Sequence, residues 1–308
     1  MLSAVLADFR RVPGLRVETV HEYPEEQRFR ELARAADYTL VIAPEFDDIL
    51  WTRCRWVEEA GGKLLGPSSD AVKRTGDKLR LARHLMDHGV PTPPVVRSQK
   101  SEVRSQKSEV RSQRRYNTDL GFPAVWKPRY GAGSQATFLV HTAAELAACA
   151  DQARTEGWRG ESILQPFVPG LPASVALLLG PRQQMALLPG EQTLSTEGRF
   201  RYHGGTLPLP PQLGERAIEL AWKAVRAVPG LQGYMGVDLV LGEASDGSQD
   251  WVIEINPRLT TSYVGLRALA ETNLAEAMLR IVAGSEVPCL KWRPGAVQFQ
   301  ADGGVQFV

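Results

Sequence analysis

The sequence predicts an α/β protein in which a small doubly wound parallel α/β unit, lacking its first strand, precedes a larger part of mixed strands and helices. Apolar strand-like runs alternate with amphipathic helical runs over residues 1–74, as in parallel α/β units. Further along, strand-like runs flank a glycine loop and form another pair at residues 233–242 and 251–257. With 43% hydrophobic and 23% charged residues over 308 positions, the chain has the apolar content that a disordered protein lacks.

The N-terminal unit is expected to contain short strands joined by helices. Residues 25–36 and 45–60 carry apolar residues at helical spacing, and each segment is long enough to connect two parallel strands. A unit of this type ordinarily begins with a strand, whereas residues 2–11 look helical, so we expect the first strand to be absent. The strands are expected at residues 15–20, 38–43 and 63–66.

The remaining elements predict a second, larger domain. A helix over residues 77–88 can be capped by Thr75 or Asp77 and ended by Gly89. Other helices are expected at residues 143–154, 213–228, 263–271 and 273–283, and strands at 122–127, 136–140, 162–168, 174–180, 233–242 and 251–257.

Composition excludes several classes of protein. No uncharged apolar run approaches the roughly 20 residues that a membrane span requires, so neither a membrane anchor nor a secretory signal is expected. Cys54, Cys149 and Cys289 are scattered and show no CxxC spacing, so neither a disulfide framework nor a zinc site is indicated. We therefore expect a cytoplasmic protein with reduced thiols.

A basic repeat interrupts the second domain. VRSQKSE occurs twice in succession from Val96 and is followed by VRSQRR, so residues 97–115 hold seven basic and two acidic side chains. Only the valines are apolar, which leaves one seam position of each heptad polar and argues against a coiled coil. Basic runs can bind nucleic acids or acidic membranes. Because no aromatic residue is interleaved before Tyr116, we expect a disordered, solvated insert and neither of those partners.

Carboxylates gather on the strand pair near residue 250. In WVIEINPR the alternation of side chains puts Val252, Glu254 and Asn256 on one face. A hairpin centred on Asp246 places Asp238 opposite Glu254. Two facing carboxylates repel each other, and two carboxylates with an amide suit Mg²⁺, so we predict a magnesium site. The alternative is that both carboxylates end solvated strand faces.

A glycine loop and two lysines suggest phosphate binding. Residues 131–134, GAGS, follow the strand that contains Lys127, and glycines let backbone N–H groups approach phosphate oxygens. The loop also fits GxGxxA, but residues 137–140 are strand-like rather than helical, which disfavours a dinucleotide site. A plain hairpin turn is the alternative. Lys78 lies in the first turn of its helix, where a nearby anion would stabilise it, although a solvated lysine explains it equally well.

Together, these segments resemble the ATP-grasp superfamily in order and spacing, over nearly the whole chain. A narrower resemblance, carried by YTLVIAP (38–44), KLLGPSSD (63–70) and NPRLTTSYVG (256–265), is to the tyramine–glutamate ligases of methanofuran biosynthesis and their bacterial relatives. The superfamily motifs are Asp77-Lys78, AVWKP (124–128), LQPFVPG (164–170), Val237-Asp238 and EINPR (254–258).

The resemblance implies a role for each of these residues. Lys78 and Lys127 would bind ATP phosphates, and Arg258 with Lys127 would steady the transferred phosphoryl group. The remaining implied roles are a loop closing over the phosphates (Gly131, Gly133 and Ser134), a hinge beside adenine (Gln165, Phe167 and Val168), and ligands for Mg²⁺ or Mn²⁺ (Asp238, Glu254 and Asn256).

The resemblance also implies a domain plan and a reaction. A pre-ATP-grasp domain would cover residues 1–74 and an ATP-grasp domain 75–300, with a nucleotide-binding subdomain at about 90–180. The enzyme would phosphorylate a carboxylate with ATP and let an amine attack the acylphosphate, yielding an amide, ADP and phosphate. The narrower resemblance implies glutamate as the acid and tyramine as the amine.

One departure from the family keeps an alternative open. Many members place an acidic residue shortly after the hinge to bind ribose, but residues 171–174 read LPAS, and no acid precedes Glu191. The alternatives are a nucleotide-binding regulatory module without turnover, or a ligase that acts on another acid and amine.

Overall fold

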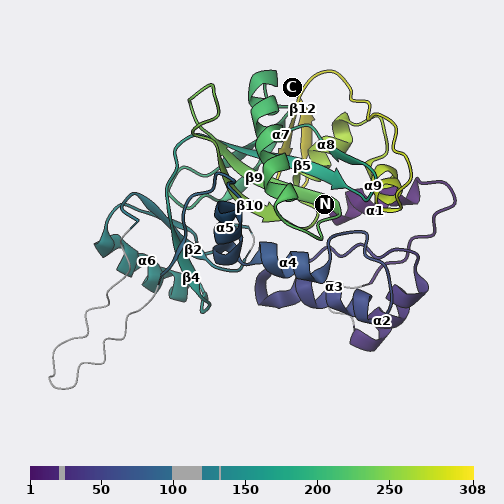
Figure 1. Cartoon of the computed structure of the whole chain (residues 1–308), viewed down its shortest axis with the longest axis horizontal. Coiled ribbons are helices and arrows are strands. Elements are labelled where there is room, and N and C mark those ends of the chain that lie inside the picture. Colours follow the sequence, from purple (N-terminus) through teal and green to yellow (C-terminus); the bar gives the residue numbers. More distant parts are fainter. Residues whose placement is uncertain (21–24, 99–119, 132) are drawn as a thin grey trace.

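Two antiparallel sheets form the framework of the protein (Figure 1). The computed structural model describes residues 1–20, 25–98, 120–131 and 133–308. Most of the predicted basic insert, residues 97–115, lies outside the described residues. The prediction of disorder is wrong at its first residue, because Arg97 belongs to a short strand and pairs with Ile163. Among the helices that are described, none has the length and apolar content needed to cross a membrane.

The smaller sheet has the strand order β1-β4-β2-β3. Helix α6 (Ala143–Thr155) packs on one face of it, and Leu146 of this helix is fully buried among Trp126, Phe138 and Leu164. Strands β2, β3 and β4 and helix α6 agree with the positions predicted from apolar runs, whereas β1 was not predicted. The strands are β1 (Val96–Arg97), β2 (Ala124–Pro128), β3 (Phe138–Val140) and β4 (Ser162–Pro166).

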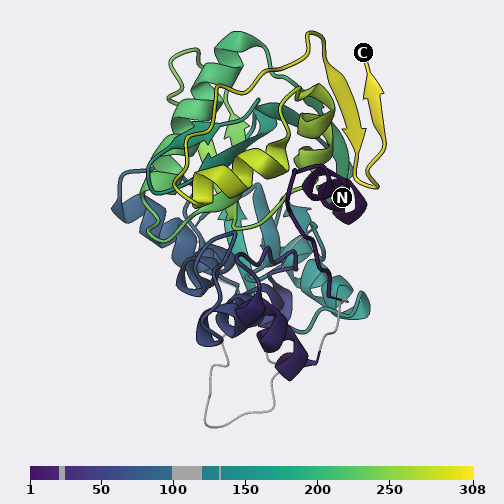
Figure 2. The ribbon, with the colours of Figure 1, turned by 90° about the vertical axis from the view of Figure 1, so that its right-hand side faces the viewer.

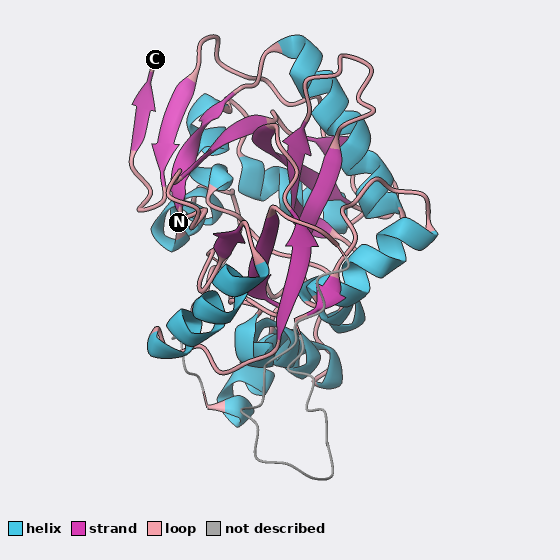
Figure 3. Ribbon diagram, turned by 90° about the vertical axis from the view of Figure 1, so that its left-hand side faces the viewer, coloured by secondary structure: helices cyan, strands magenta, loops and turns pink. Residues whose placement is uncertain are grey.

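The larger sheet runs in the order β10-β9-β5-β7-β8-β11-β12, with β6 paired to β5. In Figure 3 the last strand, β12, lies at the outer edge of this sheet beside the C-terminus. The strands are β5 (Leu171–Leu179), β6 (Gln184–Ala186), β7 (Gly190–Leu194), β8 (Tyr202–Leu207), β9 (Gly233–Leu241), β10 (Trp251–Asn256), β11 (Val297–Gln300) and β12 (Val305–Phe307).

The two faces of the larger sheet have different coverings. On β9, the odd-numbered Val237 and Leu239 are buried in a core with α5 (Lys78–Asp87) and α7 (Pro211–Arg226). Tyr234 on the opposite face packs with α8 (Ser262–Leu269) and α9 (Leu274–Val282). Further along that second face, Asp238 and Val240 line a cavity instead. Strand alternation therefore places Asp238 and Val240 on the face opposite Val237, and Leu239 of the core also borders the cavity.

The N-terminal unit is mainly helical, with one parallel bridge. Thr39 N–H donates to Lys63 O and Leu65 N–H donates to Thr39 O, both at 2.8 Å. The parallel direction agrees with the prediction, but continuous strands at 15–20, 38–43 and 63–66 do not form, because a parallel pair without further neighbours is marginal. The helical elements are α2 (Glu26–Ala35), η1 (Phe46–Asp48), α3 (Ile49–Glu59) and α4 (Ser69–Gly76).

Helix α1 (Leu2–Arg10) packs against the C-terminal helices (Figure 2). Its Asp8 is 1% exposed and accepts hydrogen bonds from Tyr263 Oη at 2.9 Å and Arg267 Nε at 2.7 Å. Burial raises the pKa of Asp8, but the hydrogen bonds from Arg267 and Tyr263 outweigh it and leave that pKa below its ordinary value.

Replacing Asp8 with asparagine should reduce the free energy of unfolding by about 2 kcal/mol at pH 7, because three donors, Arg11, Tyr263 and Arg267, lose a charged acceptor. A carboxyl group whose pKa is lower in the folded than in the unfolded chain stabilises the folded state at pH values above its unfolded-state pKa. This stabilisation is lost as the pH falls through the folded-state pKa. The deficit should therefore shrink below about pH 4. Urea unfolding of Asp8→Asn and of the exposed control Asp87→Asn across this range is the measurement. An Asp8→Asn protein as stable as wild type at pH 7 would contradict the assignment.

Candidate functional site

A cavity of about 900 Å³ lies where the two sheets and the N-terminal unit meet. Every site residue predicted from the sequence lines it, although these residues come from positions 78 to 258 of the chain. They are Lys78, Lys127, Gly131, Gly133, Ser134, Gln165, Phe167, Val168, Asp238, Glu254, Asn256 and Arg258.

The predicted hairpin register is confirmed at the carboxylates. Glu254 pairs with Asp238 across β9 and β10. A β-bulge between Val252 and Glu254 changes the register on the side nearer the turn. The prediction that Val252 shares a face with Glu254 is wrong, because the extra residue resets the alternation. Val252 is buried in the core with Ile255, and Ile253 lines the cavity beside Glu254.

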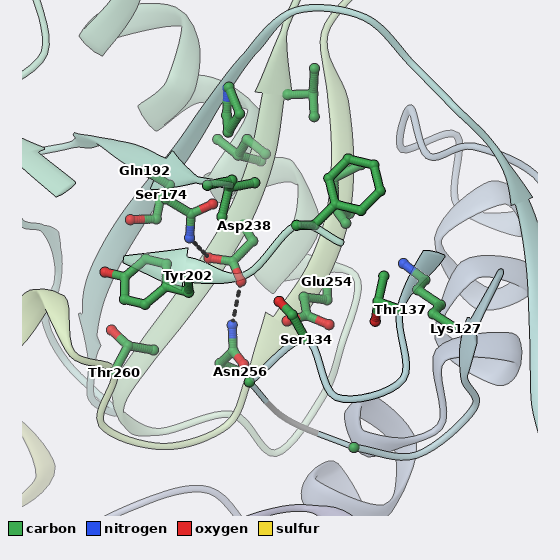
Figure 4. A pocket seen from close by; sticks show the side chains of 18 of the residues that line it. Lys127, Ser134, Thr137, Ser174, Gln192, Tyr202, Asp238, Glu254, Asn256 and Thr260 are labelled. Carbon is green, nitrogen blue, oxygen red and sulfur yellow. Dashed lines mark hydrogen bonds between the residues drawn. The ribbon is translucent and has the colours of Figure 1, made fainter. Parts of the chain in front are cut away.

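Amide groups hold the Asp238 carboxylate in place (Figure 4). Gln192 Nε2 donates to Asp238 Oδ1 at 2.8 Å, and Asn256 Nδ2 donates to Oδ2 at 2.9 Å. Burial and the neighbouring Glu254 carboxylate both raise the pKa of Asp238. Such a repelling pair is stabilised by a cation, and two carboxylates with the amide oxygen of Asn256 are the hard donors that Mg²⁺ prefers. The side chains present therefore fit a magnesium ion.

Two lysines face the carboxylates. Lys78 Nζ lies 3.2 Å from Glu254 Oε2 and donates to Gly131 O at 2.8 Å. Lys127 Nζ donates to Gln165 Oε1 at 2.8 Å. Burial raises the pKa of Glu254, but Lys78 and Lys127 outweigh it and leave that pKa below its ordinary value. Since the Lys78 side chain is 14% exposed, it is not a solvated surface lysine.

Lys127 is the most deeply buried cation of the cavity wall, with 8% of its surface exposed. Burial lowers its pKa to about 8, helped by the Lys78 cation and opposed by Glu254. An ammonium that burial destabilises gains more from an added anion than a solvated one does.

The glycine loop connects β2 to β3 and has the backbone of a tight turn. Gly133 has a φ of 71° and Ser134 of 58°, both in the left-handed region. The loop leads into a strand and not a helix, so it lacks the helix N-terminus that a dinucleotide fingerprint requires. Residue 132 lies outside the described residues.

The segment between β4 and β5 provides an apolar slot. Phe167 N–H donates to Pro123 O at 3.0 Å, and the Phe167 ring lies 6.1 Å from the ring of Phe200. Val125 and Val168 also line the cavity. Flat apolar walls of this kind suit an aromatic base.

The far end of the cavity joins the N-terminal unit to the loop after β10. Residues 42–44 and residues 260–262 line it, together with Arg258. Arg258 Nε donates to Glu45 Oε1 at 2.9 Å. Sequence reasoning missed both Glu45 and Gln192, because no spacing distinguishes one carboxylate or amide from many others.

The site can be compared with known proteins. The model of the ATP-grasp domain family matches residues 75–262, and that of the pre ATP-grasp 3 domain matches residues 4–72. Tyramine–L-glutamate ligase of Methanocaldococcus fervens is 27% identical over 251 residues, which are 82% of this chain and 68% of that protein. The same ligase of Methanocaldococcus jannaschii is 25% identical over 295 residues, which are 96% of this chain and 78% of that protein.

Solved structures share the fold. An ATP-grasp superfamily protein from Archaeoglobus fulgidus superposes with a TM-score of 0.63 at 26% identity, over 91% of this chain and 75% of that one. The ADP complex of an N5-carboxyaminoimidazole ribonucleotide synthetase superposes with a TM-score of 0.70 at 18% identity, over 91% of this chain and 69% of that one. Because the family match covers more than half of the chain and includes the strands that hold the carboxylates and lysines, the protein belongs to the ATP-grasp family, with a pre-ATP-grasp domain at its N-terminal side.

Proposed function

We propose that this protein is an ATP- and Mg²⁺-dependent ligase that activates a carboxylic acid as an acylphosphate and joins it to an amine as an amide. One observation carries the proposal. A single cavity is lined both by the carboxylates of Asp238 and Glu254 and by three cations, Lys78, Lys127 and Arg258. Phosphoryl transfer depends mainly on positioning and charge neutralisation, which these groups supply.

The proposed roles divide the cavity into two ends. At one end, the slot beside Phe167 and Val168 would take adenine, and Lys78 with Lys127 would pair with the phosphates. Asp238, Glu254 and Asn256 would hold Mg²⁺, which when bound would neutralise phosphate charge. At the other end, the acid and the amine would lie beside Arg258. The same assignment makes residues 1–74 and 75–300 the two domains.

The proposed reaction forms no covalent bond between a substrate and the enzyme. A carboxylate oxygen of the acid attacks the terminal phosphorus of ATP, and the bond to ADP breaks. The amine nitrogen then attacks the acyl carbon, phosphate leaves, and the nitrogen loses a proton. The protein has to orient these groups and neutralise the negative charge that moves onto the departing ADP and phosphate.

The relatives suggest the substrates. Both relatives described above are tyramine–L-glutamate ligases, so glutamate and tyramine are the first pair to try. The far end of the cavity is compatible with this pair. The hydroxyl of Thr261 can donate to a second carboxylate, and Ile42 and Pro44 offer apolar contact to an aromatic amine.

The direct assay is ADP release from Mg·ATP with L-glutamate and tyramine, together and separately, with the amide identified by mass spectrometry. Amide formation accompanied by ADP and phosphate supports the proposal. Formation of AMP and pyrophosphate would contradict it. Mg·ATP binding without turnover over a broad panel of acids and amines would favour a regulatory module, the alternative motivated by the missing acid at residues 171–174.

A further inference from the structure

Glu45 is a buried carboxylate that the roles above do not use. It follows residues 42–44, which line the cavity, but does not itself line the cavity. Glu45 is 8% exposed, and its Oε1 accepts the hydrogen bond from Arg258 Nε at 2.9 Å. Its Oε2 is buried without a hydrogen-bond partner among the described residues. Burial of a carboxylate is unfavourable unless a cation compensates it, and Arg258 provides that cation.

The contacts of Arg258 show what this pairing does. A guanidinium has five N–H donors in one rigid plane. Besides the bond to Glu45, Arg258 Nη1 donates to Leu259 O at 3.2 Å and Nη2 donates to Asn256 Oδ1 at 3.4 Å. The other N–H of each terminal nitrogen has no acceptor among the described residues, and Arg258 lines the cavity. Because the other acceptors are neutral and their bonds longer, the Glu45 contact contributes most to fixing the plane.

We propose that Glu45 is a positioning residue of the ligase site, which holds Arg258 so that its two remaining N–H groups point at the transferred phosphoryl group. This inference rests on the proposed function. Glu45 acts through Arg258 and not on a substrate. The N-terminal unit thus contributes to the phosphoryl-transfer step in addition to covering one end of the cavity.

The test uses Glu45→Gln, which keeps the shape of the side chain but removes its charge, and Glu45→Ala. We expect Glu45→Gln to lower kcat roughly 10- to 100-fold, since a small misplacement of a catalytic group has effects of this size. The Kd for Mg·ATP should stay within about twofold, because the ground state is bound by other groups. The matched control is Glu58→Gln, in the same unit, where the carboxylate accepts from Ser69 N at 2.8 Å. It should retain wild-type kcat.

A double-mutant cycle separates positioning from general destabilisation. If Glu45 acts through Arg258, Glu45→Gln combined with Arg258→Gln should be no slower than Arg258→Gln alone. Fully additive losses, or Glu45→Gln with wild-type kcat, would overturn the proposal. Thermal unfolding shows whether each variant is folded. If Glu45→Ala is unfolded, the kcat of the more conservative Glu45→Gln tests the proposal.

A binding measurement keeps the test independent of substrate identity. Tetrafluoroaluminate bound beside Mg·ADP imitates the transferred phosphoryl group. The increase in ADP affinity that tetrafluoroaluminate causes therefore measures contacts made in the transition state. Glu45→Gln should lose most of this gain while binding Mg·ADP normally, and an undiminished gain would overturn the role of Glu45. Absence of wild-type turnover with every acid and amine would instead contradict the proposed function alone.

Discussion

Replacing Glu254 with glutamine should lower kcat on the order of 1,000-fold, because losing a metal ligand removes several kcal/mol of transition-state stabilisation. The affinity for ATP should change much less, since charge on the transferred phosphoryl group develops only during the reaction. Steady-state kinetics of ADP release, with the Kd for Mg·ATP from calorimetry, measures both quantities.

Glu243→Gln is the control for this variant, because Glu243 is exposed in the loop of the same hairpin. It should behave as wild type. If Glu254→Gln keeps full turnover at saturating Mg²⁺, the metal assignment fails for Glu254, and the facing carboxylates must have another role.

Replacing Lys127 with alanine should weaken Mg·ATP binding about 10- to 100-fold, the equivalent of one charged hydrogen bond in a buried setting. Lys127 is buried and its ammonium is destabilised by burial, so phosphate oxygens should bind it strongly. Calorimetric titration with Mg·ATP or its non-hydrolysable analogue gives the Kd directly.

Lys223→Ala is the matched control, since Lys223 is an exposed lysine of α7 that pairs with Glu219. Its Kd should equal that of wild type. Lys127→Met removes the charge but keeps most of the side-chain volume, so it separates the effect of the lost charge from that of a packing cavity. An unchanged Kd in both Lys127 variants would remove this lysine from the nucleotide site.

The hairpin that holds the carboxylates shows how far the sequence predicts the site. Alternation and the position of the turn are enough to pair Asp238 with Glu254, because each residue along a strand is constrained by its neighbours. The bulge beside Val252 was not predictable, since a single inserted residue leaves the hydrophobic pattern almost unchanged. The pairing of Asp238 with Glu254 was therefore predicted correctly, although the face assigned to Val252 was not.

Strands β1, β6, β7, β8, β11 and β12 were not predicted, for a related reason. Strand β7 reads GEQTL and β8 reads YHGGTL, so neither has the apolar alternation by which strands are recognised. They form because neighbouring strands of the larger sheet offer them backbone partners. Gln192 reaches Asp238 from one of these strands, which is why its contact could only be found in the folded chain.

In the N-terminal unit, the sequence predicts strands that the structure does not contain. Apolar runs there predicted three strands, but only the bridge between Thr39 and Leu64 forms. Residues 42–44 instead line the cavity, and Glu45 directly after them reaches Arg258. A local pattern cannot distinguish a strand from an extended segment whose partner lies more than 200 residues away in the chain.

The measurement that tests the central claim most directly is the transfer of an oxygen atom from the acid to phosphate. With ¹⁸O in the carboxylate of the acid that supports turnover, acylphosphate formation requires that the released phosphate carries one atom of the label. Mass spectrometry of that phosphate should therefore show singly labelled phosphate in proportion to amide formed. Unlabelled phosphate, or label appearing in AMP, would contradict the account.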